Sequence, residues 1–148
     1  MGAQPYGFAP FDPGRTFLCR LPHDADLLKW LNQFAREREI RLATLFVIGA
    51  VKKATVAFYD QQQRTYRQIG FEENLEILSC LGNVSVREDR PFVHCHATFS
   101  NDRGETVGGH LVEGTIVFAA EAHFQEALGT ELVREVDPLT GLTLWSRA

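Results

Sequence analysis

From Leu42 onward, the chain consists largely of short runs of apolar, β-branched and aromatic residues separated by polar segments. Such runs favour β-strands, and the polar segments between them favour turns. The expected strands cover residues 42–48, 54–59, 65–69, 75–81, 92–99, 106–113 and 115–122. Residues 49–53 suit a hairpin or a bulged pair of strands, and residues 84–87 are expected to be short and exposed. A chain with this pattern must build most of its core from a sheet.

One segment before these runs has the spacing of a surface helix. Apolar side chains recur three and four residues apart, while Lys, Arg and Glu occupy other positions. The apolar positions are Leu27, Leu28, Leu31, Phe34 and Ala35. The sequence predicts a helix of about four turns, with Asp24 as its N-cap, after a strand at residues 15–21.

The length of 148 residues is that of one domain. One helix and many strands predict an α+β fold: a single domain, residues 15–148, whose central sheet is mixed or largely antiparallel and carries one main helix packed on it. Residues 1–14, rich in Pro, Gly and aromatic side chains, are expected to form an extended N-terminal arm, either packed on a neighbouring subunit or free as a loose terminus. Residues 130–145 are expected to form two short extended pieces around a turn.

The composition argues against several classes of protein. The longest apolar runs, such as residues 43–51, are far shorter than the roughly 20 residues of a membrane-spanning helix. The N-terminus lacks the basic start and apolar core of a secretion signal, so a cytoplasmic location is expected. The three cysteines, Cys19, Cys80 and Cys95, are widely spaced, which fits reduced thiols. The net charge of −4 disfavours direct DNA binding, because the chain as a whole would repel phosphate.

Three histidines carry the most concentrated chemistry. His94 and His96 are two residues apart on an expected strand, so their rings lie on the same face, and a return strand can bring His110 beside them. Three neutral imidazoles are the ligand set of a zinc site with an open fourth position. The alternative is that the rings are structural and form hydrogen bonds with carboxylates or the backbone. A slip in register or a bulge at the preceding glycines would also separate them.

Four further residues near this pattern are candidates for supporting roles. Gly108 and Gly109 precede His110 and permit a positive φ or the close approach of another backbone. Glu113 follows three residues later and is a candidate to orient a ligand histidine or carry a proton. Glu76 is a charge inside an apolar strand, which indicates either a partner or pocket or, more simply, an edge strand.

These residues stand within segments that resemble one family. The segments are Glu-Ile-Leu-Ser-Cys-Leu-Gly-Asn at residues 76–83, His-Cys-His at 94–96, Gly-Gly-His-Leu at 108–111, Glu-Gly-Thr at 113–115, Gly-Arg at 14–15 and Ile-Gly-Ala-Val at 48–51. In order and spacing they resemble the PPC family, the "plants and prokaryotes conserved" domain. The resemblance implies a homotrimer with the histidines near a subunit boundary, where bacterial relatives hold a metal. In plants this domain follows DNA-gripping AT-hook segments and mediates association with itself and other proteins; this chain has no Arg-Gly-Arg-Pro hook.

The favoured function is therefore a bacterial-type PPC protein: a homotrimeric, metal-binding assembly or regulatory module rather than a catalyst. Its cofactor is expected to be a divalent metal, zinc first, held by His94, His96 and His110, and its partners to be its own copies and other proteins. One alternative is a metal-dependent enzyme in which Glu113 or a neighbouring subunit's group handles protons. A second alternative is a DNA-binding protein, which the acidic balance disfavours.

Overall fold

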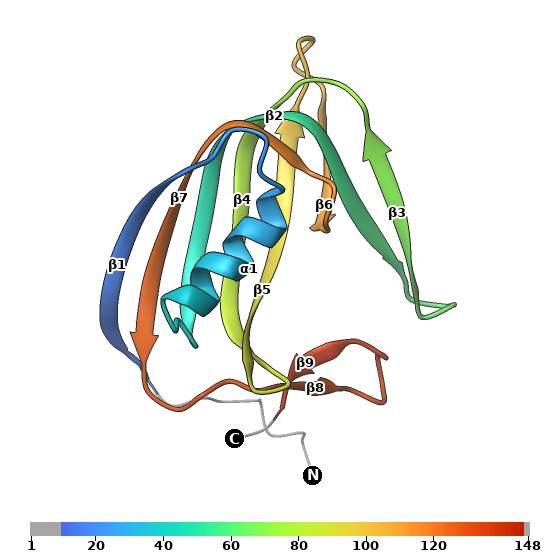
Figure 1. Cartoon of the computed structure of the whole chain (residues 1–148). Helices are drawn as coiled ribbons and strands as arrows, with labels where there is room; N and C mark the ends of the chain where they lie inside the picture. Colours follow the sequence, from blue (N-terminus) through green and yellow to red (C-terminus); the bar gives the residue numbers. More distant parts are fainter. Residues whose placement is uncertain (1–9, 147–148) are drawn as a thin grey trace.

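The computed structural model describes residues 10–146, in which seven strands form one large antiparallel sheet covered by a helix and two short strands form a second sheet (Figure 1). In chain order the elements are β1 (Asp12–Leu21), α1 (Leu27–Glu37), β2 (Ala43–Asp60), β3 (Thr65–Phe71), β4 (Leu75–Arg87), β5 (Arg90–Ser100), β6 (Thr106–Leu111), β7 (Ile116–Leu128), β8 (Arg134–Val136) and β9 (Thr143–Trp145). The predicted α+β fold with one main helix is confirmed. The N-terminal residues 1–9 of the expected arm lie outside the described part, and the first strand begins at Asp12 rather than at Arg15.

The long strand β2 organises the sheet. The strand order is β1-β7-β2-β4-β5-β6, and β3 also pairs with β2. The second half of β2 turns away from β4 and pairs with β6, where Val56 faces Leu111 and Ala57 faces His110. The strands β2, β4, β5 and β6 therefore close on themselves. The short pair β8 and β9 lies at the end of the sheet below β5 (Figure 1).

The expectation of a hairpin at residues 49–53 is wrong, because these residues continue one 18-residue strand, β2. The register shifts between Val47 and Gly49 and again on either side of Val51, so β2 is bulged and bends without ending. Gly49 has a φ of +138° and lies so close to β7 that a Cβ atom there would overlap the carbonyl oxygen of Ala119. Glycine supplies both the backbone conformation and the space that this bend needs.

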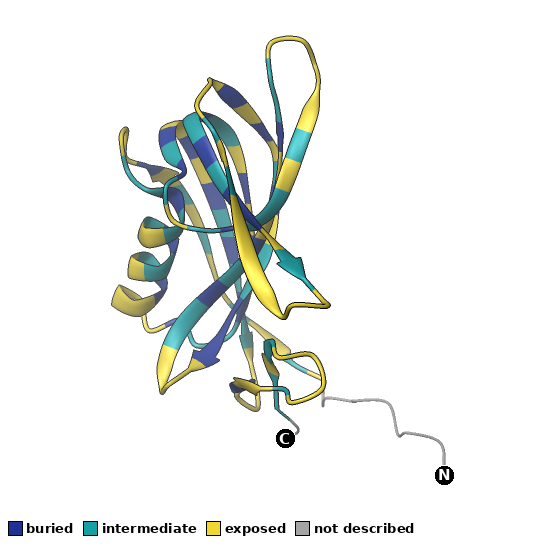
Figure 2. Cartoon of the chain, turned by 90° about the vertical axis from the view of Figure 1, so that its right-hand side faces the viewer, coloured by how far each residue is buried: buried dark blue, intermediate teal, exposed yellow. Residues whose placement is uncertain are grey.

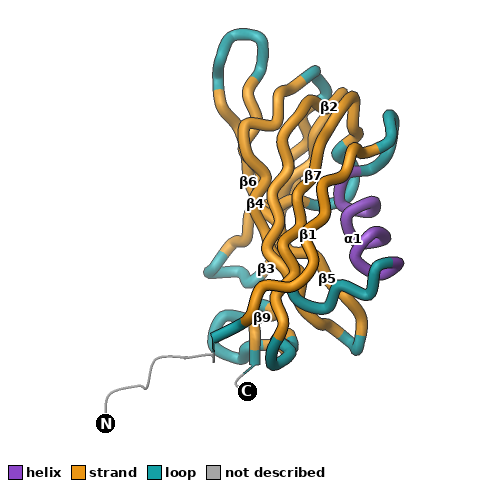
Figure 3. The backbone as a smooth tube through the Cα atoms, turned by 90° about the vertical axis from the view of Figure 1, so that its left-hand side faces the viewer, coloured by secondary structure: helices purple, strands orange, loops and turns teal. Residues whose placement is uncertain are grey.

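The helix lies on one side of the sheet, as Figure 3 shows. It is about three turns long, with the buried side chains of Leu27, Leu31 and Ala35 facing the core. The aromatic ring of Phe34 packs on that of Phe124 of β7 at 5.1 Å between centroids. The expected apolar stripe is thus the packed face of the helix.

The N-cap of the helix is Asp26 and not Asp24. The side chain of Asp26 accepts hydrogen bonds from the backbone N–H groups of Lys29 (3.1 Å) and Gly114 (2.7 Å). Asp24 instead has a φ of +65° and forms an ion pair with Lys52. The cap lies two residues later because the chain first makes a turn that brings it against β7.

Residues 84–87 are also not the short, exposed piece expected, since they are the last part of β4. Val84, Ser85 and Val86 are buried. The tail covers them: the N–H of Val86 donates to the carbonyl of Leu132 at 3.0 Å. A segment that looked exposed was buried by residues almost 50 positions later in the sequence.

The face of the sheet away from the helix carries exposed apolar side chains. The residues that we call the open face are the exposed Leu18, Phe46, Ile48 and Leu81 and the half-buried His123, from strands β1, β2, β4 and β7. Most of them line one shallow hollow of about 380 Å³. In Figure 2 exposed positions alternate with buried ones along the strands, as expected for a sheet with only one covered face. Among the described residues, no helix is long and apolar enough to span a membrane.

Candidate metal centre

The three histidines predicted as ligands lie together on two neighbouring strands. His94 and His96 project from β5 and His110 from β6, with His96 and His110 directly paired in the antiparallel register. Their nitrogen ligand atoms all lie within 4.8 Å of one another. The ring centroids are 5.1 to 5.3 Å apart. This geometry allows one ion to contact all three rings after small side-chain rotations.

The strand pairing that brings the rings together follows from alternation along β5. Val93, Cys95, Ala97 and Phe99 are buried, so the intervening histidines must face the other side. The register between β5 and β6 runs from Ser100 to His96 without a shift. The bulge that would have separated the histidines is absent from this pairing.

Gly108 and Gly109 allow β6 to lie between two other strands. A Cβ atom on Gly108 would overlap the carbonyl oxygen of Ala97 on β5. A Cβ atom on Gly109 would lie 3.0 Å from the carbonyl oxygen of Ala57 on β2. Neither glycine has a positive φ among the described residues, so their role here is close approach rather than an unusual backbone conformation.

The surroundings favour the neutral form of two of the three imidazoles, those of His94 and His110. Burial lowers the pKa of His94 to about 4, and the nearby Arg134 and the other two rings contribute in the same direction. Burial also lowers the pKa of His110, with smaller contributions from His96 and Arg134. A metal ligand must present an unprotonated nitrogen, so these shifts favour metal binding at neutral pH.

One nitrogen of the cluster lacks the partner that a structural histidine would have. Nδ1 of His110 is buried and has no hydrogen-bond partner among the described residues. A buried polar atom without a partner costs free energy, and most such atoms in proteins are paired. No carboxylate forms an ion pair with any of the three rings in the described part of the chain. A cation held by the rings fits this donor set better than the structural alternative.

Arg134 of β8 is a site residue that the sequence did not reveal. Its side chain reaches back across β4 and donates to Oγ of Ser85 (2.7 Å) and Oδ1 of Asn83 (2.8 Å). Nη2 lies 3.4 Å from Nδ1 of His94. Burial lowers the pKa of the guanidinium from its ordinary value, with a contribution from Arg87. No local pattern marks this arginine, because its position depends on how the tail packs.

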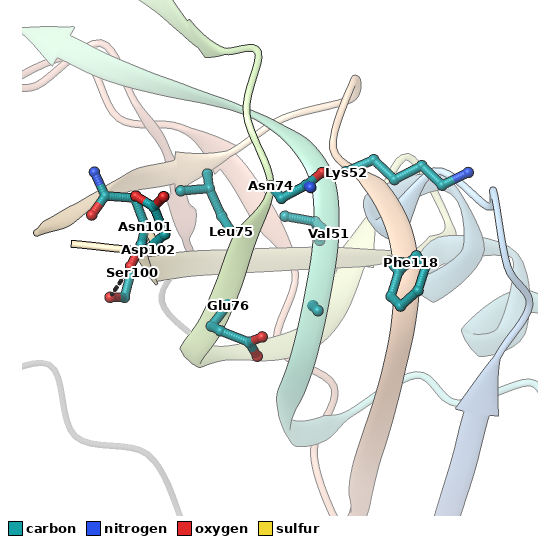
Figure 4. Close-up of a pocket in the computed structure, with 10 residues that line it drawn as sticks. Val51, Lys52, Asn74, Leu75, Glu76, Ser100, Asn101, Asp102 and Phe118 are labelled. Atoms are coloured by element: carbon teal, nitrogen blue, oxygen red, sulfur yellow. Dashed lines mark hydrogen bonds between the residues drawn. The ribbon is translucent and has the colours of Figure 1, made fainter. Parts of the chain in front are cut away.

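The two carboxylates considered as supporting groups lie elsewhere. Glu113 forms an ion pair with Lys29 at the start of the helix at 3.2 Å, and both side chains are exposed. Glu76 is exposed on β4, which lies between β2 and β5, so an edge position does not explain it. It lines a separate pocket of about 510 Å³ with Lys52 and Asp102 (Figure 4). Neither carboxylate lines the pocket at the histidines.

The histidines face a cavity of about 500 Å³. His96 is exposed, while His94 and His110 are half-buried. The ring of Tyr66 from β3 packs on His110 at 5.1 Å between centroids, and Arg134 and Phe92 also line the cavity. An ion bound to the rings can therefore keep a coordination position that faces the cavity.

Two solved structures have the same fold as this chain, and the similarity extends over almost the whole length of both chains in each comparison. A metal-containing protein from Archaeoglobus fulgidus is 38% identical, with a TM-score of 0.89 over 95% of this chain and 99% of that one. A plant- and prokaryote-conserved protein from Pyrococcus horikoshii is 34% identical, with a TM-score of 0.90 over 96% of this chain and 98% of that one.

One curated relative is much longer than this chain. It is the bifunctional protein GlmU of a Synechococcus strain, which is 30% identical over 136 residues. The alignment covers 89% of this chain but 20% of that protein. The chain therefore spans a small part of this relative.

The sequence profile of the Plants and Prokaryotes Conserved (PCC) domain, the family abbreviated PPC above, matches residues 9–127. The match covers both strands of the histidine cluster and most of the sheet, and it confirms the resemblance found in the sequence segments around them. The chain belongs to the Plants and Prokaryotes Conserved domain family.

Proposed function

We propose that this protein is a homotrimeric metal-binding module with an assembly or regulatory role. Its ion, zinc before other divalent metals, is held by His94, His96 and His110. Imidazole nitrogen suits zinc and other first-row transition metals better than calcium or magnesium, which prefer oxygen ligands.

The observation that carries the metal proposal is the convergence of three imidazole rings, one of which has an unpaired buried nitrogen. The ligand atoms lie within 4.8 Å of one another, and Nδ1 of His110 has no partner in the described structure. The relative from Archaeoglobus fulgidus is described as metal-containing, which supports the same assignment here.

The open face supports the proposed assembly. Across the sheet, Leu18, His123, Phe46 and Leu81 face one another in successive pairings, and Leu81 pairs in turn with His96. Exposed apolar surface of this kind on a folded protein marks an interaction site. A second copy on this face would lie beside the histidines, in line with the subunit-boundary position that the family resemblance implies.

Elemental analysis of protein purified without a polyhistidine tag tests the metal proposal. We expect about one zinc or similar divalent ion per chain in the unaltered protein, and none above background in His96→Ala, since two imidazoles hold such an ion poorly. His23→Ala is the control, because His23 lies outside the cluster and contacts Phe118. If the wild-type protein retains no zinc after incubation with zinc and desalting, the metal proposal is wrong.

A metal-dependent enzyme is the second candidate, and the cavity of about 500 Å³ beside the rings favours it. The described lining offers no carboxylate as a proton carrier, and burial raises the pKa of Tyr66, which makes it a poor base at neutral pH. A proton carrier would have to come from a neighbouring subunit or from the ligand. An ion whose coordination is closed by protein groups alone would contradict this candidate; an exchangeable water, detected by anion-induced spectral changes after cobalt substitution, would support it.

Direct DNA binding is the weakest of the three functions. The chain carries 15 Lys and Arg against 19 Asp and Glu. Binding to DNA would require basic residues gathered on one face of the assembly and would weaken steeply with salt. Fluorescence anisotropy with labelled duplex at low salt tests it, and we expect no binding.

A further inference from the structure

We propose that the pocket at the histidines takes a small carboxylate ligand, held between Arg134 and the ion bound by the rings. This inference rests on the metal proposal and adds the chemical class of the ligand. It starts from a charge imbalance. The chain is acidic overall, yet none of the described residues that line this pocket is Asp or Glu, while two are arginines, Arg87 and Arg134.

The guanidinium of Arg134 is buried without a counter-ion. The residue is 8% exposed, and no ion pair within residues 10–146 includes it. Its hydrogen bonds go to neutral oxygens, those of Ser85, Asn83 and the carbonyl of Thr143 (3.1 Å). A buried charge usually has a partner of opposite charge, because leaving water is costly. An anionic ligand would supply that partner.

The surroundings fix the guanidinium in place rather than leaving it free to swing away. The rings of Phe92 and Trp145 lie 5.8 and 5.6 Å from Cζ of Arg134. Ser85 and Asn83 belong to β4, the neighbour of the strand that carries His94 and His96. Such a fixed planar cation binds a ligand with less loss of side-chain entropy than a free surface arginine.

The guanidinium of Arg134 lies directly beside one of the three histidines. Nη2 of Arg134 lies 3.4 Å from Nδ1 of His94, so the guanidinium and an ion on the rings are neighbours. A cation bound by the rings would repel the neighbouring guanidinium, and an anion between the two would offset that repulsion. A carboxylate has two oxygens in one plane, which suits one contact with the guanidinium and one with the ion.

The remaining hydrogen-bonding capacity favours carboxylate over phosphate. A guanidinium has five N–H donors, and Arg134 already uses three of them on neutral oxygens and directs a fourth at His94. A phosphate, with more oxygens and more charge, needs more donors than are left. The cavity of about 500 Å³, walled partly by Tyr66 and Phe92, has room for a small organic body beside the charged group.

Calorimetric titration of zinc-loaded, untagged protein with malonate tests the inference, at constant ionic strength. We expect saturable binding to the wild type and at least roughly tenfold weaker binding to Arg134→Gln, which corresponds to about 1.4 kcal/mol. Arg87→Gln is the matched control: Arg87 also lines the pocket but is paired with Glu88, so a change of less than about threefold is expected. The neutral analogue malonamide should not compete.

The outcomes separate this inference from the metal proposal. Failure of the wild type to load zinc defeats both. Normal zinc loading with no malonate binding, or with equal binding to Arg134→Gln, overturns the inference alone. Tighter binding of inorganic phosphate than of malonate would contradict the assignment of a carboxylate as the ligand.

A second variant covers the case in which circular dichroism shows that Arg134→Gln does not fold. Arg134→Lys keeps the positive charge without the planar guanidinium and should still weaken the binding of malonate. Cobalt-loaded protein gives a second readout: malonate should change its visible spectrum, and an unchanged spectrum contradicts contact with the metal.

Discussion

The imidazole of His94 is half-buried beside the guanidinium of Arg134, and both features oppose its protonation. The neutral state is therefore the resting state of this ring well below neutral pH. The neutral state suits metal binding. At low pH, however, protonation would place a positive charge next to an arginine and lower the free energy of unfolding of the metal-free protein. The same side chain thus links the site to the stability of the whole chain.

We expect the metal-free protein to lose stability between pH 6.5 and about 4. The pKa of His94 falls from 6.5 to about 4 on folding, so in this window the unfolded chain binds a proton that the folded chain does not. Stability from the neutral ring is complete above pH 6.5 and is lost as the pH falls through the folded-state value. Allowing for partial exposure, the loss is on the order of 1–2 kcal/mol.

Urea titrations in EDTA at pH 7 and 4.5 measure this loss. His94→Gln should lose less free energy of unfolding between the two pH values than the wild type, because glutamine does not titrate. Equal losses in the two proteins would show that other groups account for the acid sensitivity.

Among the elements, the strands around the site were the easiest to predict. Alternation of apolar and polar side chains in β5 assigns the histidines to one face, and this pattern is local. The pairing of β5 with β6 was predictable for the same reason, because only a short polar turn separates them. The local pattern of residues was therefore enough to predict that the three histidines lie together and that a hairpin joins their strands.

Features that depend on distant parts of the chain could not be predicted. The continuity of β2 depends on β4 and β7, which hold its bulges in register on both sides. The burial of Ser85 and the place of Arg134 depend on a tail that returns to β4. No periodicity in a single segment contains this information. The N-cap was displaced for a similar reason, because Asp26 is fixed partly by the N–H of Gly114.

The bend of β2 gives a prediction about Gly49. Gly49→Ala combines a positive φ with an overlap against the backbone of Ala119, so we expect a loss of more than about 2 kcal/mol in the free energy of unfolding. Gly70→Ala on β3 is the matched control, because nothing lies within 4 Å of a Cβ atom there. Its effect should stay within about 0.5 kcal/mol. Urea denaturation measures both, and similar losses in the two variants would contradict this account of the bend.

The N-cap of the helix gives a second prediction about stability. Asp26→Ala removes the acceptor for two N–H groups, of Lys29 and Gly114, and should cost about 1–2 kcal/mol. Asp24→Asn is the comparison, since asparagine tolerates the positive φ and the change removes only exposed ion pairs, those with Lys52 and His23. That change should cost less than about 0.5 kcal/mol. Thermal denaturation followed by circular dichroism measures both, and a larger loss for Asp24→Asn would reverse the assignment of the cap.

At the scale of the whole molecule, the metal centre and the open face are continuous. Leu81 pairs with Phe46 on one side and with His96 on the other, so the apolar surface meets the histidine cluster at a single residue. Assembly through this surface would shield the exposed ring of His96 from water. Metal binding and assembly would then stabilise each other, because each orders the same edge of the site.

Leu81→Glu tests the proposed assembly. A buried carboxylate in an apolar interface costs several kcal/mol, so we expect the variant to be monomeric at concentrations where the wild type is expected to be a trimer. Leu139→Glu is the control, because Leu139 is also exposed but lies on the turn between β8 and β9, away from the open face. Light scattering coupled to size-exclusion chromatography gives the mass of each. A wild type that is itself monomeric, or a trimer unaffected by Leu81→Glu, would exclude this face as the interface. If assembly and metal binding are coupled as proposed, the monomeric variant should also bind zinc more weakly than the Leu139→Glu control.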